Sequence, residues 1–133
     1  MPHQFECRVY YEDTDLAGIV YYANYLKFIE RARTEFIRSR ALDQTRLRQD
    51  LGVVFVVRHL ECDYHQPAKF DDLLIVATSL LEMTGARLML QQTVTCTGRR
   101  LFSANVTLAC VAQSGGPVRI PADIRRKLRP NSA

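Results

Sequence analysis

The sequence predicts an α+β fold in which one long helix packs on a five-stranded, largely antiparallel sheet. Residues 22–40 carry apolar side chains at helical spacing, and five other segments look like β-strands. Four of these strands follow one another with short connections, which join antiparallel neighbours. A single helix with a broad apolar face needs a wide partner, and a sheet provides one.

The first elements are a short strand and the long helix. Residues 5–11, FECRVYY, alternate well enough for a strand. From residue 22 to about 40, apolar side chains form one continuous stripe on a helix. The stripe consists of Tyr25, Phe28, Ile29, Ala32 and Phe36. Glu30 and Arg33 lie off this stripe, three positions apart, where they can pair on the surface.

Four strands and two minor helical segments complete the prediction. Residues 41–51 are expected to form a short helical or irregular segment, and residues 121–130 a basic helix. The strands are expected over 53–65, 73–83, 86–96 and 101–112, with turns at 84–85, 97–100 and 114–117 and a break over 66–72 at Pro67. No linker or repeat interrupts the chain, so we expect one domain over residues 1–133.

Composition limits the function classes. The 133 residues are 47% hydrophobic and 24% charged, which is typical of a globular protein with its own core. No apolar run reaches the ~20 residues of a membrane span, and no signal-peptide pattern is seen, so a cytoplasmic location is expected. The four cysteines and three histidines show no metal-ligand spacing, and we expect no metal and no cofactor. Serine-hydrolase, nucleotide-binding and RNA-recognition motifs are absent, and we expect no nucleic-acid partner.

One segment, EDTDLAG at residues 12–18, contains more acidic side chains than a turn requires. Asp13 and Asp15 alternate, so in an extended chain they point the same way, and Gly18 allows a sharp bend. The helix that follows exposes unpaired N–H groups at its start. A carboxylate opposite such groups can attack a carbonyl or activate water while the N–H groups hold the oxyanion. The commoner alternative is an aspartate that only caps a helix or shapes a turn.

Residues 10–33, YYEDTDLAGIVYYANYLKFIERAR, resemble the signature of hotdog-fold acyl-CoA thioesterases. The pattern is that of the YbgC-like, 4-hydroxybenzoyl-CoA thioesterase-like group: Y-x-D-T-D-x-x-G-h-V-Y-[HY]-x-x-Y, then E-x-A-R. The stretches CDYHQPAKFDDLL (62–74) and IPADIRRKL near the C-terminus also resemble that group. The resemblance covers nearly the whole chain and implies a hotdog fold.

The resemblance also implies an activity, the hydrolysis of acyl-CoA to a free acid and CoA. Asp15, the second aspartate of D-T-D, would be the catalytic carboxylate, acting as nucleophile or as general base. The backbone N–H of Tyr22 would polarise the thioester carbonyl. Many YbgC-like members carry histidine where this chain has Tyr22, and this difference leaves the acyl preference open.

The family implies a shared site in a homodimer or homotetramer, because its protomers join sheets edge to edge. The remaining expected substrate-binding residues are Asp13, Gly18, Tyr25, Tyr64, Pro67 and Arg87. Asp13 is expected to support the loop. Arg87, just after the 84–85 turn, is expected to hold the CoA phosphates, with Arg99 and Arg100 as weaker candidates.

Two alternatives remain. An acyl-carrier-protein thioesterase would need a large basic patch beside the acyl tunnel, because its partner is acidic. A non-catalytic acyl-CoA-binding or scaffold protein, associated with the Tol-Pal cell-envelope system or with lipid-synthesis proteins, would bind without turnover. A hotdog dehydratase is disfavoured because no histidine occurs in the D-T-D motif.

Overall fold

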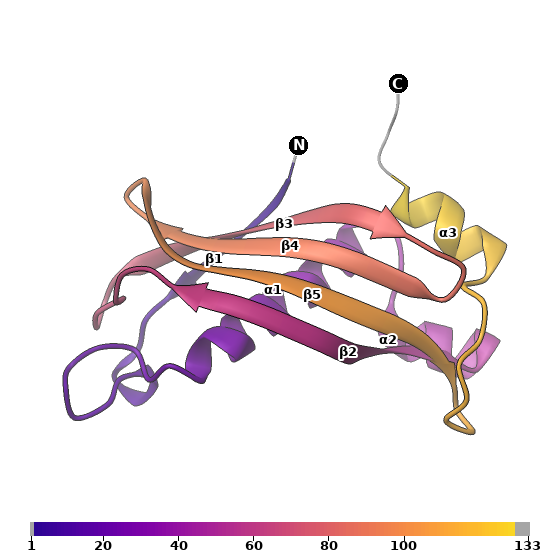
Figure 1. The fold of residues 1–133 in the computed structure, drawn as a ribbon, viewed down its shortest axis with the longest axis horizontal. Helices are drawn as coiled ribbons and strands as arrows, with labels where there is room; N and C mark the ends of the chain where they lie inside the picture. Colours follow the sequence, from indigo (N-terminus) through magenta and orange to yellow (C-terminus); the bar gives the residue numbers. More distant parts are fainter. Residues whose placement is uncertain (1, 130–133) are drawn as a thin grey trace.

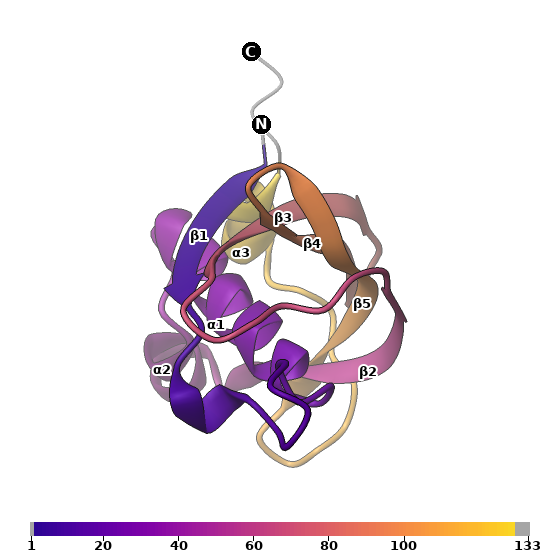
Figure 2. The same ribbon diagram turned by 90° about the vertical axis from the view of Figure 1, so that its left-hand side faces the viewer.

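Five antiparallel strands form one curved sheet in the order β1-β3-β4-β5-β2. They are β1 (His3–Arg8), β2 (Val53–Tyr64), β3 (Leu73–Met83), β4 (Arg87–Cys96) and β5 (Arg99–Ala112). In the computed structural model, which describes residues 2–129, the sheet curves around the long helix α1 (Asn24–Ser39) (Figure 1 and Figure 2). This is the hotdog arrangement expected from the sequence.

The apolar stripe of α1 faces the sheet. All five predicted stripe residues are buried, together with Arg33 and Ile37. The helix begins at Asn24 and ends at Ser39, two residues later and one earlier than expected. Strand β1 ends at Arg8 because the chain turns into a single 3-10 turn over Tyr11–Asp13. The prediction of the long helix is therefore confirmed, with small shifts at its ends.

A buried polar network joins the helix to the sheet. Gln92 of β4 is fully buried, and its Nε2 donates to the Ile29 carbonyl of α1 and to Thr78 Oγ1 of β3, both at 2.9 Å. Its Oε1 accepts a hydrogen bond of 3.0 Å from Arg33 Nη1. The expectation that Arg33 pairs with Glu30 on the surface is wrong, because Arg33 is only 9% exposed. Burial lowers the pKa of Arg33, while the charge of Glu30 acts in the opposite direction.

Short helical segments lie at the end of the molecule that is opposite to the loop preceding α1 (Figure 1). The segment after α1 contains α2 (Gln44–Arg46) and a π-helical turn, η2 (Leu47–Leu51). The terminal helix α3 (Ala122–Leu128) lies beside the end of β3 (Figure 1). None of the helices described over residues 2–129 has the length and apolar character that a membrane span requires.

Candidate active site

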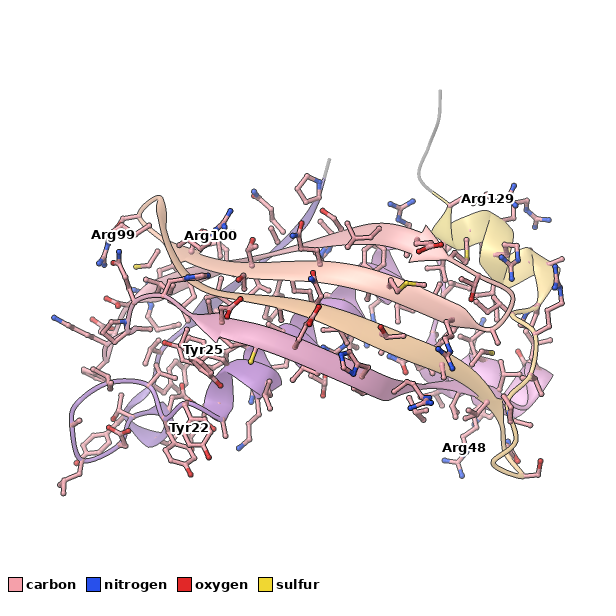
Figure 3. All side chains as sticks on the ribbon, viewed as in Figure 1. Tyr22, Tyr25, Arg48, Arg99, Arg100 and Arg129 are labelled. Carbon is pink, nitrogen blue, oxygen red and sulfur yellow. The ribbon has the colours of Figure 1, made fainter. Side chains whose placement is uncertain are left out.

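A pocket of about 320 Å³ opens where α1 begins and β2 ends. Its lining residues are Ile19, Val20, Tyr22, Tyr25, Tyr64, His65, Gln66 and Pro67. We call it the tyrosine pocket. Four of the expected site residues, Tyr22, Tyr25, Tyr64 and Pro67, thus lie together. Figure 3 shows Tyr22 and Tyr25 at this end of the molecule.

Aromatic packing fixes the wall of the tyrosine pocket. The Tyr25 ring stacks on Phe102 of β5, with centroids 4.9 Å apart and an interplanar angle of 13°. The Tyr25 hydroxyl accepts a 3.0 Å hydrogen bond from the Ala68 N–H, and the Tyr64 hydroxyl donates to the Tyr22 carbonyl at 2.9 Å. Burial raises the pKa of both Tyr25 and Tyr64 above the ordinary value. Both phenols are therefore neutral near pH 7 and can only donate or accept hydrogen bonds.

The acidic loop leads directly into this pocket. A bridge between Thr14 and Val20 closes the loop, and the Asp15 N–H donates to the Ile19 carbonyl at 2.9 Å. Gly18 sits at the bend with φ of 81°, a conformation that favours glycine. The Asp15 side chain is exposed, and its Oδ1 accepts a 2.9 Å hydrogen bond from the Ala17 N–H. Ile19 and Val20 line the pocket, and Asp15 precedes them in the sequence by only a few positions in the same loop.

Asp13 has a different environment. Its Oδ2 accepts a 2.8 Å hydrogen bond from the Tyr10 N–H. Its carbonyl accepts from the Tyr21 N–H and from the Asn24 side chain, both at 2.9 Å. The carbonyl contacts connect the loop to the start of α1. The carboxylate contact stabilises the turn that follows Tyr10, so one Asp13 oxygen is already hydrogen-bonded.

The start of α1 offers one backbone donor, the Tyr22 N–H, that has no acceptor among residues 2–129. Ala23 occupies the capping position and supplies no side-chain acceptor. An exposed carboxylate, an apolar pocket and an unpaired amide donor are the components that acyl transfer requires.

The arginines lie at two different ends of the sheet. Arg99 Nη1 donates to Gln66 Oε1 at 3.0 Å, beside the tyrosine pocket, and Figure 3 shows Arg99 and Arg100 at that end. Arg87 pairs with Ala109, whereas Tyr64 pairs with Phe102, seven positions away along β5. At ~3.4 Å per residue, Arg87 lies roughly 24 Å along the sheet from that position. Within one chain, the structure does not bring Arg87 to the pocket.

Several pocket residues were not predicted individually. The sequence predicts His65 as the last residue of the 53–65 strand and Gln66 as part of the break over 66–72, although the segment 62–74 that contains both resembles a family motif. The His65 Nε2 lies 2.9 Å from Ser103 Oγ. Ile19 and Val20 reach the pocket because Val20 N–H donates to the Ala68 carbonyl at 2.8 Å. Among the described residues, no cluster of His, Cys, Asp or Glu is arranged to hold a metal ion.

Comparison with known proteins agrees with this arrangement. A family model described as the thioesterase-like superfamily matches residues 9–128. The chain belongs to this superfamily. A Haemophilus influenzae protein named acyl-CoA thioesterase YbgC is 43% identical over 122 residues, which cover 91% of this chain and 90% of that protein. A Helicobacter pylori protein of the same name is 35% identical over 125 residues, covering 86% and 91% of the two chains.

A solved structure supports the same membership. The crystal structure of a probable thioesterase from Bartonella henselae matches with a TM-score of 0.88 and 38% identity. The match covers 91% of this chain and 100% of the other. This chain therefore resembles proteins named as thioesterases both in its sequence and in its hotdog fold.

Proposed function

We propose that this chain is an acyl-CoA thioesterase that hydrolyses the thioester of acyl-CoA to a free carboxylic acid and CoA. The observation that carries the proposal is the exposed Asp15 carboxylate, in a loop that leads into an apolar pocket beside the Tyr22 N–H, which has no acceptor within the described range 2–129. The names of the two YbgC relatives support it. Neither the acyl-carrier-protein nor the scaffold alternative has support from these relatives.

The proposed mechanism uses the groups at this end of the molecule. The acyl group occupies the tyrosine pocket, and the Tyr22 N–H donates to the thioester oxygen as negative charge develops on it. In one route, Asp15 attacks the carbonyl carbon and expels CoA thiolate, and water then hydrolyses the mixed anhydride. In the other, Asp15 takes a proton from water as that water attacks the carbonyl carbon, and the tetrahedral intermediate then expels CoA thiolate, which takes up the proton. Asp13 and Gly18 set the shape of the loop.

A second copy of the chain is part of this proposal. Strand β2 is an edge of the sheet, and antiparallel pairing of two β2 edges would reverse the second sheet relative to the first. The Arg87 end of that copy would then meet the Tyr64 end of this one. Arg87 of a second copy is thus a proposed ligand for the CoA phosphates, and Arg99 is the candidate within the same chain. We also propose that residues 1–133 form one domain and that the protein is located in the cytoplasm.

Thiol release from a panel of CoA thioesters tests the proposed activity. Asp15→Asn keeps the size of the side chain and removes its charge, so we expect kcat to fall at least ~100-fold while the fold is retained. Asp13→Asn is the matched control. It should mainly lower stability, because the Asp13 carboxylate accepts the Tyr10 N–H.

Two results would contradict the proposal. Near-normal turnover in Asp15→Asn, with loss in Asp13→Asn, would mean that the wrong carboxylate was chosen. Binding of CoA thioesters by the wild type without turnover of any of them would favour the scaffold alternative.

A further inference from the structure

Exposed apolar side chains gather around the acidic loop, residues 12–18. Tyr11 packs against Phe70 and Tyr21 against Tyr22, with ring centroids 6.4 and 4.9 Å apart. Leu16, at the tip of the loop, is fully exposed. A contiguous exposed apolar patch commonly marks a surface that contacts another molecule. We call this surface the loop patch, and it consists of Tyr10, Tyr11, Leu16, Tyr21, Tyr22 and Phe70.

The acidic loop gives this patch a negative charge. Glu12, Asp13 and Asp15 occur between residues 10 and 26, a stretch that contains no basic side chain. The Asp13 and Asp15 carboxylates accept local N–H groups. Glu12 is exposed and has no ion-pair partner within residues 2–129. The loop patch therefore suits a partner that presents both apolar and basic side chains.

The proposed two-copy arrangement brings one segment of the second copy to the loop patch. Figure 1 shows the loop that precedes α1 and the helix α2 at opposite ends of the sheet, and Figure 2 shows both on the side of the sheet that carries α1. A two-fold axis through the middle of the β2 edge exchanges the two ends and keeps the helices of both copies on one side of the joined sheet. Residues 44–51 of the second copy, the α2–η2 segment, then lie beside the loop patch of the first.

The α2–η2 segment offers side chains that complement the loop patch. Leu51 is about half exposed, and Arg48 is exposed without an ion-pair partner in the part of the chain that the structure describes. Figure 3 shows Arg48 at the end of the molecule away from the tyrosine pocket. Arg46 and Asp50 line one pocket of about 590 Å³, which Arg48 does not line, and Asp43 caps α2. Arg48 is therefore the free basic group of this segment.

We propose that the loop patch of each copy docks on the α2–η2 segment of the other, with Glu12 against Arg48 and Leu16 against Leu51. The inference rests on the proposed function, because it uses the two-copy arrangement described there. In a two-fold dimer the same contact occurs twice. Glu12 and Leu16 lie on either side of Asp15 in the acidic loop, so the contact holds the loop that carries the proposed reacting carboxylate. Arg48 is thus a positioning residue that the second copy supplies.

A charge-swap cycle on the full chain tests the contact, with fluorescence-detected sedimentation as the measurement of dimer affinity. Glu12→Arg and Arg48→Glu each place like charges together. Each should raise the dissociation constant of the dimer about 10-fold, because an exposed charge pair contributes a few-fold and occurs twice. The combined variant restores opposite charges and should return to within about 3-fold of the wild type. Leu16→Ser should also weaken the dimer, because it removes the apolar contact.

The matched control combines Glu12→Arg with Arg46→Glu. It makes the same changes of charge in the same segments, but Arg46 lines the pocket of about 590 Å³. The control should show no rescue. Equal rescue by both combinations would indicate a general charge effect, and simple addition of the two losses in the Arg48 cycle would mean that Glu12 and Arg48 do not meet. Either result would overturn the proposal.

Turnover of a CoA thioester separates positioning of the loop from assembly alone. At concentrations where sedimentation shows Arg48→Glu to be dimeric, its kcat should still fall at least about 3-fold with KM nearly unchanged, and the charge-swapped variant should recover it. An unchanged kcat in dimeric Arg48→Glu would contradict the positioning role. Absence of turnover in a wild type that shows the charge-swap coupling would reject the proposed activity and leave the docking contact in place.

Discussion

At the residue scale, hydrogen bonding separates two aspartates that lie two positions apart. The Asp13 carboxylate holds the Tyr10 N–H, whereas the exposed Asp15 carboxylate accepts only a local hydrogen bond from Ala17 within residues 2–129. A carboxylate that must react needs free oxygens near the substrate. This difference supports Asp15 as the reacting group and gives Asp13 a supporting role.

The hydroxyls of Tyr25 and Tyr64 in the tyrosine pocket should differ in their contribution to stability. Tyr25→Phe leaves the buried Ala68 N–H without its acceptor, so the free energy of unfolding should fall by about 1–3 kcal/mol. Tyr64→Phe removes a hydrogen bond from a side chain that is 47% exposed, where water can replace it, and should cost less than about 1 kcal/mol. Urea unfolding of both variants measures the difference. Equal losses would argue against the buried role of the Tyr25 hydroxyl.

Cys7 should make the protein less stable at alkaline pH. Burial raises the pKa of the Cys7 thiol from 9.0 to about 11, with Arg31 acting to lower it and Asp13 to raise it. The stabilisation from the neutral thiol is complete below about pH 9 and is lost as the pH rises through about 11. We expect the free energy of unfolding to fall by about 1–2 kcal/mol over this interval because of Cys7.

Urea unfolding at several pH values checks this prediction with Cys7→Ala as the comparison. Burial also raises the pKa of Cys110, Tyr25 and Tyr64, so the wild type should lose stability from several groups in the same direction. Only the difference in the free energy of unfolding between wild type and Cys7→Ala is attributed to Cys7. Parallel pH profiles would mean that Cys7 does not titrate as expected.

At the element scale, Gln92 connects α1 to two strands. Gln92→Met removes the acceptor of the buried Arg33 and the donor to Ile29 and Thr78. A buried charged group without its partner is costly, so we expect the free energy of unfolding to fall by about 2–4 kcal/mol. Gln91→Met, on the exposed neighbour in the same strand, should change it by less than about 0.5 kcal/mol.

A second variant separates the network from simple packing. Adding Arg33→Met to Gln92→Met removes the uncompensated charge, so the double variant should recover part of the lost stability. Thermal unfolding of the single and double variants provides the measurement. If the two losses add without recovery, the cost arises from side-chain volume rather than from the charge.

At the scale of the whole molecule, the sheet has one long edge that is suited to pairing. Strand β2 spans 12 residues at the edge, and Val56 and Val57 are 42% and 52% exposed. Long apolar edge strands tend to pair with another chain. We expect the protein to be at least a dimer at micromolar concentration, as the shared-site proposal requires.

Sedimentation velocity of edge variants tests the assembly. Val57→Lys places a charge on the exposed edge and should weaken self-association at least ~10-fold. Leu81→Lys changes an equally apolar side chain, 57% exposed, on an inner strand and should leave the assembly intact. A stable and fully active wild-type monomer would rule out a site shared between two copies.

The sequence by itself determined the order and type of the elements and the acidic loop, because both are encoded locally. The helical stripe and the strand segments depend on spacing within each segment, and the D-T-D-x-x-G motif is continuous. The tertiary structure alone decided contacts between distant segments. It buried Arg33 against Gln92, joined Tyr22 and Tyr25 at the start of α1 to the loop after β2, and placed Arg125 of α3 against the 84–85 turn. These contacts depend on sheet register and on the path of the chain, which no local pattern contains.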